Sequence, residues 1–195
     1  MSKDSQKLFL ASGNRHKIEE LRQLLEPLGY KLTSTLDLAD APEVEEDQST
    51  LEGNALKKAR FWHSKTGLPA IADDTGLEVD ALNGRPGVYS ARYAGENATD
   101  SDNVDKLLKE LSGESNRLAR FRTVVAFVNG DEEHHFEGLC EGEIISERVG
   151  DKGFGYDPIF LPKGYGRTFA ELTSEEKNEI SHRGRALQKF LKFIG

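Results

Sequence analysis

Two adjacent carboxylates, Asp73 and Asp74, follow an apolar run and precede a hydroxyl and a glycine, in the order Ala70-Ile71-Ala72-Asp73-Asp74-Thr75-Gly76. An apolar run that ends in polar residues and glycine is typical of a buried strand leading into a loop, where functional groups often lie. Because side chains alternate along a strand, the two aspartates should point to opposite faces. Two acids this close repel each other unless a cation or a donor lies between them. An acidic turn in which one aspartate caps a helix is the alternative.

A candidate anion-binding loop lies near the N-terminus. Residues 8–11 predict a buried strand, and residues 18–28 carry apolar side chains at helical spacing. The order of strand, glycine turn and helix brings backbone N–H groups and the positive end of the helix to the loop. The loop lacks the spacing of a Walker A motif, and an ordinary capped turn is the alternative interpretation. Its residues are Ser12, Gly13, Asn14, Arg15, His16 and Lys17.

The elements between these two segments are an acidic loop and a helix. Residues 43–47 predict a solvated loop, and residues 50–65 predict a helix with apolar residues at helical spacing. Lys57 and Lys58 project from that helix at neighbouring angles, so we expect at most one of them to face a site. The acids of the loop are Glu43, Glu45, Glu46 and Asp47.

The second half of the chain predicts a helix, then β structure, then further helix. Residues 77–82 predict a short helix or strand, and residues 99–113 predict a helix. Residues 121–127 predict a strand that turns back at Asn129-Gly130, the strongest hairpin signal in the chain. The return strand covers about residues 134–139 and can extend to residue 149. A capping-box pattern begins the last segment at Thr173, and we expect a helix break or a new helix start at residues 181–185.

A glycine-rich loop at residues 150–166 presents aromatic side chains and one acid. Its central sequence, Phe154-Gly155-Tyr156-Asp157-Pro158, predicts a rigid turn. Aromatic rings and a carboxylate suit a purine, by stacking on the base and by reading its edge. A purely structural loop is the alternative interpretation.

Composition limits the kind of protein. The chain has 195 residues, of which 31% are charged and 36% hydrophobic, and we expect one globular domain over residues 1–195. A net charge of −8 argues against a surface that coats nucleic acid, but it leaves room for a small basic pocket that binds one nucleotide. Cys140 is the only cysteine, which excludes an internal disulfide and a cysteine-rich zinc site. With no signal-like or membrane-length apolar run, we expect a cytoplasmic protein that does not bind a membrane.

Four blocks of unusual composition, in this order, resemble the inosine/xanthosine triphosphate pyrophosphatase family, also called Ham1-like or XTP/dITP diphosphatases. The similarity extends over about residues 8–191, and the combination of blocks makes it specific. The blocks are residues 12–17, residues 70–76 together with 87–93, residues 154–160, and residues 181–184.

This resemblance implies the fold, the reaction and the cofactor. The fold would be α/β, with a long twisted mixed sheet flanked by helices and two lobes around a central nucleotide cleft. The family hydrolyses deaminated, non-standard purine nucleoside triphosphates (ITP, dITP and XTP) to the monophosphate and pyrophosphate. It requires Mg²⁺ and forms homodimers, so we expect a small-molecule nucleoside triphosphate as substrate and a second copy as partner, with no nucleic acid bound.

The resemblance also implies roles for individual residues. Asp74 matches the general base and metal-side carboxylate, and Thr75 matches a hydroxyl that contacts substrate. Glu46 matches the other metal-side acid, with Glu45 as the alternative register. The family usually has Glu-Asn-Ala at the start of its second helix, whereas this chain has Gly53 before the Asn and Ala. The triphosphate would be bound by residues 12–17, and the nucleoside and phosphates by Phe154, Gly155, Tyr156, Asp157, Lys177, His182 and Arg183.

Two other functions are compatible with parts of the pattern. One is a Maf-like pyrophosphatase of different base specificity, which the combination of residues 154–157 with residues 181–184 disfavours. The other is a nucleotide-binding module without hydrolysis. Binding a polyanion does not by itself need two pairs of acids, so the retention of both pairs disfavours this second function.

Overall fold

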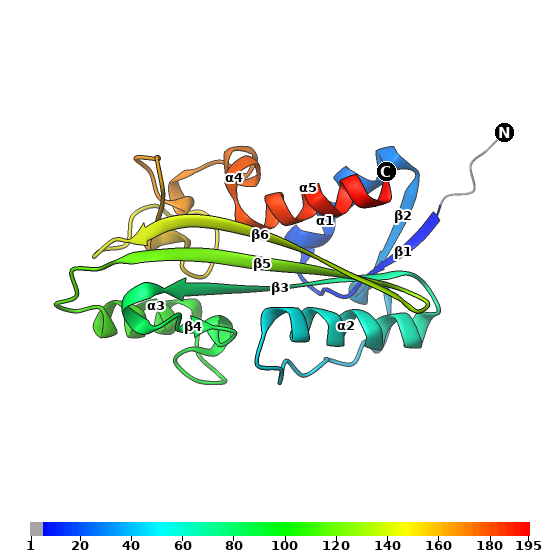
Figure 1. Cartoon of the computed structure of the whole chain (residues 1–195), viewed down its shortest axis with the longest axis horizontal. Helices are drawn as coiled ribbons and strands as arrows, with labels where there is room; N and C mark the ends of the chain where they lie inside the picture. Colours follow the sequence, from blue (N-terminus) through cyan, green and yellow to red (C-terminus); the bar gives the residue numbers. More distant parts are fainter. Residues whose placement is uncertain (1–5) are drawn as a thin grey trace. The chain divides into compact units, whose positions relative to one another are not determined.

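A mixed sheet of seven strands, flanked by helices, is the framework of the chain and confirms the predicted α/β class (Figure 1). The computed structural model describes residues 6–195, apart from the side chains of His16 and Glu20. The strand order is β2-β1-β3-β5-β6-β7, and β4 pairs with β3. β1 is parallel to β2 and β3, whereas β4 is antiparallel to β3 and β7 to β6. The strands are β1 (Gln6–Leu10), β2 (Tyr30–Ser34), β3 (Ala70–Val79), β4 (Pro86–Gly87), β5 (Leu118–Asn129), β6 (Glu132–Ile144) and β7 (Phe160–Pro162).

Five α-helices occur in the described residues. The predicted break in the last helical segment is confirmed, because α4 ends at Ile180 and α5 begins at His182. Ser181 separates the two helices, and its Oγ accepts a hydrogen bond from the backbone N–H of Gly184 at 3.1 Å, which satisfies a donor in the first turn of α5. The helices are α1 (Arg15–Leu25), α2 (Leu51–Thr66), α3 (Asp100–Glu110), α4 (Ser174–Ile180) and α5 (His182–Ile194).

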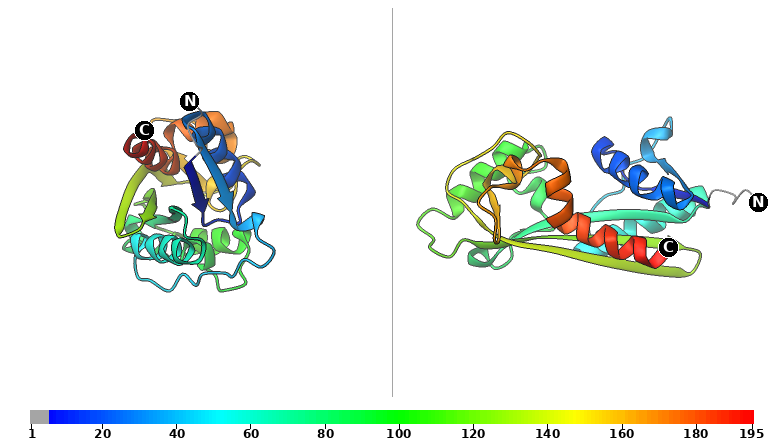
Figure 2. Two further views of the ribbon diagram at one scale, coloured as in Figure 1. Left: turned by 90° about the vertical axis from the view of Figure 1, so that its right-hand side faces the viewer. Right: turned by 90° about the horizontal axis from the view of Figure 1, so that it is seen from above.

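The chain divides into two compact units that share the long strands. Unit 1 contains Met1–Asp74, Val124–Phe136 and Leu187–Gly195, and unit 2 contains Thr75–Thr123 and Glu137–Ala186. In unit 1, α2 and the C-terminal part of α5 cover opposite faces of the sheet (Figures 1 and 2). The core of unit 1 includes Phe9 stacked on Trp62 at 4.9 Å. The core of unit 2 includes three aromatic rings in mutual contact, those of Phe121, Phe160 and Phe169.

Strand β3 is longer than the sequence pattern predicts. The expectation that the apolar run ends in a loop at the paired aspartates is wrong, because β3 continues through Asp73 and Asp74 to Val79. Gly76 allows this continuation. A Cβ at Gly76 would lie 2.5 Å from the carbonyl oxygen of Gly87, so only a glycine lets β4 approach β3 here.

The return strand of the hairpin is shorter than its predicted limit. β6 ends at Ile144 instead of reaching residue 149. The backbone N–H of Ile145 donates to the carbonyl oxygen of Ile159, and that of Val149 donates to Pro158. The chain beyond β6 is therefore held by the turn at residues 157–159 and does not continue the strand.

The contact at Gly76 predicts a large effect for a small substitution. We expect Gly76→Ala to lower the free energy of unfolding by about 1–3 kcal/mol, because the added methyl group must push β4 away. Urea denaturation measures this loss. Gly166→Ala is a matched control in the same unit, since nothing lies within 4 Å of a Cβ at Gly166. Equal stability of the two variants would contradict the close approach of the two strands.

Within residues 6–195, the structure contains no helix that is both long enough and apolar enough to span a membrane.

Candidate active site

Three carboxylates and two lysines of unit 1, here called the acid–lysine cluster, are brought together by four segments of the chain. They are Lys17 on α1, Glu46 in the loop before α2, Lys58 on α2, and Asp73 and Asp74 on β3. Lys58 is at its centre. Its Nζ lies 2.5 Å from Oε1 of Glu46 and 3.9 Å from Oδ1 of Asp74. It also donates to the backbone carbonyl oxygen of Asp73 at 2.7 Å. The two acids predicted to hold a metal therefore face the same ammonium group.

The sequence left open which of two adjacent lysines and which of two adjacent glutamates faces the site, and the structure distinguishes between them. Lys58 faces the acids, whereas Lys57 pairs with the exposed Asp47 at 2.7 Å, as expected if only one of the two lysines faces a site. Glu45 is exposed and Glu46 is the acid that contacts Lys58. The register that assigns Glu46 to the cluster thus fits the structure better than the alternative with Glu45.

The predicted anion-binding loop lies between β1 and α1 and reaches the cluster through Lys17. The Nζ of Lys17 donates to Oδ2 of Asp73 at 2.7 Å. Asn14 precedes α1 and caps its first turn, since its Oδ1 accepts from the backbone N–H of Lys17 at 3.3 Å. Ser12 Oγ accepts from the N–H of Asn14 at 3.2 Å. Gly13 and Arg15 are exposed, so the loop is open to solvent. The side chain of the remaining predicted residue, His16, lies outside the described part of the structure.

Burial and charge set the protonation of the cluster. Asp74 is only 8% exposed, and burial is the largest cause that raises its pKa from 3.8 to about 6. The charge of Lys58 and the hydrogen bond from Asn54 oppose this shift, and the carboxylates of Glu46 and Asp73 add to it. For Lys58, burial opposes protonation, but Asp74, Glu46 and Asp73 together outweigh it and raise the pKa. Lys58 is therefore a permanent cation, while Asp74 becomes a base close to neutral pH.

Asn54 is a residue of this site that the sequence analysis missed. It is fully buried, its Nδ2 donates to Oδ2 of Asp74 at 3.0 Å, and its Oδ1 accepts from the backbone N–H of Gln48 at 2.9 Å. Both ends of its amide are satisfied, so it holds Asp74 in one orientation. The departure from the family pattern at Gly53 is explained beside it, because a Cβ there would lie 2.8 Å from Cβ of Gln48. Gly53 thus gives Gln48 the room to bond to Asn54.

The donor set of the cluster fits a hard divalent cation. Its carboxylate oxygens are the ligands that Mg²⁺ takes, usually one or two carboxylates together with substrate phosphates. Glu46 and Asp74 already surround a position that attracts positive charge, and the three carboxylates exceed the two ammonium groups by one charge. In the part of the chain that the structure describes, no group of three or more His, Cys, Asp or Glu side chains is placed to hold a metal ion by itself. A site completed by a phosphate-bearing substrate fits these residues, and an all-protein site does not.

In unit 2, the loop predicted to contact the nucleoside is organised around Asp157. This carboxylate is 3% exposed and accepts from the backbone N–H of Phe154 at 2.9 Å and from Nζ of Lys177 at 2.6 Å. The Nζ of Lys177 also lies 5.0 Å from the centre of the Phe154 ring, and the guanidinium carbon of Arg183 lies 6.0 Å from it. Lys177 and Arg183 thus lie beside the exposed ring of Phe154, and Asp157 binds the backbone of the same residue.

Two other predicted residues of the loop have structural contacts. Tyr156 is 5% exposed and its hydroxyl donates to the carbonyl oxygen of Ser90 at 2.8 Å. Burial is the largest cause that raises its pKa. The backbone N–H of Gly155 donates to the carboxylate of Asp100 at 2.8 Å. These contacts hold in place the part of the loop that directly follows Phe154.

The last predicted pair, Thr75 and His182, is linked through Thr123. The Oγ1 of Thr123 lies 2.6 Å from Oγ1 of Thr75 and 2.6 Å from Nδ1 of His182. The start of α5 fits tightly against its surroundings in unit 2. A Cβ at Gly138 of β6 would lie 1.9 Å from the carbonyl oxygen of His182, and a Cβ at Gly184 would lie 1.9 Å from that of Asn178.

A sequence model of the Ham1 family matches residues 8–193. The chain belongs to the Ham1 family. A relative from Flavobacterium psychrophilum named dITP/XTP pyrophosphatase is 47% identical over 96% of this chain and 98% of its own length. A relative of the same name from Desulforamulus reducens is 50% identical over 96% and 95%. Among solved structures, a HAM1 protein from Coxiella burnetii is 43% identical, with a TM-score of 0.92 over 97% of this chain and 98% of the other. These matches confirm the family predicted from the four sequence blocks.

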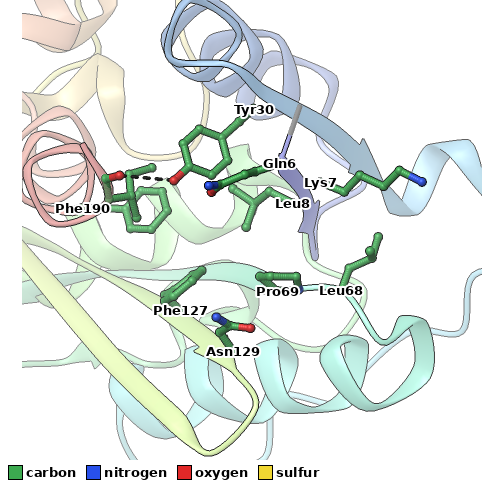
Figure 3. Close-up of a pocket in the computed structure, with 10 residues that line it drawn as sticks. Gln6, Lys7, Leu8, Tyr30, Leu68, Pro69, Phe127, Asn129 and Phe190 are labelled. Carbon is green, nitrogen blue, oxygen red and sulfur yellow. Dashed lines mark hydrogen bonds between the residues drawn. The ribbon is translucent and has the colours of Figure 1, made fainter. Parts of the chain in front are cut away.

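A separate hollow in unit 1 of this Ham1-family chain has a volume of about 730 Å³ (Figure 3). It lies beside β1, and Leu8, Tyr30, Phe127 and Phe190 give it a largely apolar lining. It contains none of the residues of the acid–lysine cluster. The Tyr30 hydroxyl at its edge donates to the carbonyl oxygen of Ile194 at 3.2 Å.

The raised pKa of Asp74 predicts a pH-dependent stability in metal-free buffer. A carboxyl whose folded pKa is about 6 favours the folded state while it is protonated, and this contribution is lost as pH rises from about 4 through 6. At about pH 8 the ionised group costs about 3 kcal/mol, because burial raises its pKa from 3.8 to about 6. At that pH we therefore expect the free energy of unfolding of Asp74→Asn, which stays neutral, to be about 3 kcal/mol higher than that of the parent.

Urea denaturation in the presence of a chelator at several pH values measures this difference. The gain should vanish below about pH 4, where Asp74 is protonated in both the folded and the unfolded chain. A gain that is independent of pH would show that burial does not raise the pKa of Asp74.

Proposed function

We propose that this chain hydrolyses dITP, XTP and ITP to the nucleoside monophosphate and pyrophosphate. Relatives nearly half identical over nearly the whole chain carry the name dITP/XTP pyrophosphatase. The observation that carries the proposal is the buried Asp74, held by Asn54 and facing the same ammonium group as Glu46. A carboxylate with a pKa near 6 is a base matched to neutral pH, which the activation of water requires.

The reaction follows from the roles of these groups. Hydrolysis breaks the link between the α- and β-phosphorus, and Asp74 takes a proton from the attacking water. Lys17 and the backbone N–H groups at the start of α1 bind the phosphate chain and stabilise the charge on the departing pyrophosphate. Glu46 and Asp74 would hold Mg²⁺, which neutralises phosphate charge when it is bound. Dependence on Mg²⁺ is part of the proposal.

Base selection has a simple basis in hydrogen bonding. Hypoxanthine and xanthine carry an acceptor oxygen at position 6, where adenine carries an amino donor. Donors from His182, Arg183 or loop N–H groups can bond to this oxygen. The amino group of adenine is itself a donor, so it cannot accept a hydrogen bond from them. An unmatched buried polar group costs about 1–3 kcal/mol, so such a site discriminates between the two. Phe154, exposed at 49%, offers a ring on which the base can stack.

The resemblance that predicted the family also leads us to propose a homodimer acting in the cytoplasm. Light scattering coupled to size-exclusion chromatography tests the dimer, whose expected mass is twice 21.7 kDa. A monomer at micromolar concentration would overturn this part of the proposal without affecting the reaction.

Turnover of a nucleotide panel with saturating Mg²⁺ tests the function. The panel contains dITP, XTP, ITP, ATP, GTP, dTTP and UTP, and the assay scores pyrophosphate separately from orthophosphate. We expect pyrophosphate from dITP, XTP and ITP and little from ATP. Preference for dTTP or UTP would favour the Maf-like alternative, and binding of ITP without pyrophosphate release would favour a non-hydrolytic module. Omission of Mg²⁺ in the presence of a chelator should abolish turnover.

A further inference from the structure

A buried hydroxyl joins two predicted substrate-binding residues inside unit 2. Thr123 on β5 contacts Thr75 and His182, each at 2.6 Å. Thr123 is fully buried and is the only polar side chain in residues 123–128, which otherwise read Val, Val, Ala, Phe and Val. Valine has the same branched shape and would pack equally well in a strand, whereas a buried hydroxyl without partners destabilises the folded chain. The two contacts therefore account for a threonine at this position.

Packing fixes the position of the His182 ring, so the open question is which ring nitrogen carries the proton. It is 6% exposed, stacks on Phe121 with ring centres 4.8 Å apart, and lies 6.3 Å from the ring of Phe169. A neutral imidazole has one N–H donor and one acceptor nitrogen, and the partner of one nitrogen decides which is which. For His182 the partner of Nδ1 is Thr123.

Thr123 can give its single hydroxyl proton to only one neighbour. If it donates to Nδ1 of His182, it accepts from Thr75, and His182 carries its proton on Nε2. In the reverse order, Nδ1 of His182 donates to Thr123 and Thr123 donates to Thr75. The direction of this short chain of hydrogen bonds and the tautomer of His182 are therefore one property.

We propose that Thr123 is a specificity-determining positioning residue, which donates to Nδ1 and so holds His182 in the tautomer whose Nε2–H can donate to a purine 6-oxo group. The proposal rests on the proposed function, which assigns His182 to the base. A 6-oxo purine offers an acceptor to this donor, whereas a 6-amino purine opposes it with a second donor. Thr75 then directs its own proton to Thr123 and offers only lone pairs to its other neighbours.

Two substitutions separate the hydroxyl from the shape of the side chain. Thr123→Val keeps the branched shape and removes the hydroxyl, and Thr123→Ser keeps the hydroxyl. We expect Thr123→Val to lower the ratio of kcat/KM for ITP to kcat/KM for ATP by about tenfold, and Thr123→Ser to stay within about twofold of the parent. An equal loss on ITP and ATP, or the same loss in both variants, would show a merely structural role and overturn the proposal.

The tautomer can be read directly by NMR of the nucleotide-free protein with ¹⁵N-labelled histidine, the His182 signal being identified by its absence from His182→Asn. We expect Nε2–H in the parent and in Thr123→Ser, and a mixture of tautomers in Thr123→Val. A parent with the proton on Nδ1, or a valine variant with an unchanged tautomer, would overturn the proposal. If the valine variant does not fold, the parent spectrum still decides.

The spectrum does not depend on catalysis, so the two proposals can fail separately. A protein that releases no pyrophosphate from ITP refutes the proposed function and leaves the tautomer of His182 measurable. A protein that is active and selective but carries the proton on Nδ1 refutes the role of Thr123 alone.

Discussion

We expect the replacement of Asp74 by Asn to lower kcat for dITP by about 10²–10⁴-fold, the usual contribution of a general base. The substitution keeps the shape of the side chain and its ability to accept the hydrogen bond that Asn54 donates to Asp74 at 3.0 Å. It removes only the basic oxygen that we propose takes the proton of water. Steady-state kinetics with Mg²⁺ and calorimetric titration of a non-hydrolysed nucleotide separate the chemical step from binding, which should remain within a few fold of the parent.

Asp47→Asn is the matched control for this variant. Asp47 follows Glu46 in sequence, but its side chain is 47% exposed and pairs with Lys57. We expect its turnover to equal that of the parent. Near-normal turnover in Asp74→Asn, with nucleotide still bound, would mean that another group activates the water.

Removing the ammonium group of Lys58 has the second large effect, on stability. Its side chain is 14% exposed and faces Glu46 and Asp74, while its Nζ also bonds to the backbone of Asp73. Loss of one partner of a buried ion pair leaves charge without compensation and typically costs about 3–5 kcal/mol. We therefore expect Lys58→Met to lower the free energy of unfolding by this amount in metal-free buffer at neutral pH, measured by urea denaturation.

The neighbouring lysine provides the comparison. Lys57 and its partner Asp47 are 33% and 47% exposed, so Lys57→Met should cost no more than about 1 kcal/mol. Addition of Mg²⁺ should stabilise Lys58→Met more than the parent, because a divalent cation can take the place of the lost positive charge among the acids. Equal losses in the two variants would show that Lys58 does not hold the acid–lysine cluster together.

The parts of the site that the sequence predicted are those that depend on local pattern. Apolar runs and caps placed β1, α1 and α2, and the last helix break follows from the polar residues around Ser181. The length of β3 could not be predicted, because it depends on the approach of Gly87 to Gly76, a contact between segments far apart in the sequence. Patterns of hydrophobicity report which face a residue occupies, and they contain no information on which distant backbone lies beside it.

The same limit explains why Asn54 and Thr123 escaped the sequence analysis. Asn54 lies one residue after the departure from the family pattern at Gly53, but an asparagine on a helix has no signature that identifies Asp74 as its partner. Thr123 directly precedes a run of five apolar residues, which is a signal, although threonine is common enough in strands to need no explanation there. Only the distances to Thr75 and His182 give its hydroxyl a chemical meaning.

If His182 binds the base as proposed, the contact between Gly138 and this first residue of α5 restricts how base preference can be redesigned. Because there is no space for even a methyl group at Gly138, the backbone of His182 packs directly against the backbone of β6. No side chain of Gly138 is available to be varied at this contact. Mutant libraries that seek new nucleotide preferences should therefore leave Gly138 and Gly184 unchanged. Substitutions should instead be made at Phe121, Thr123 and Phe169. Their side chains lie around the imidazole, so they can change its environment while the backbone contact at Gly138 is kept.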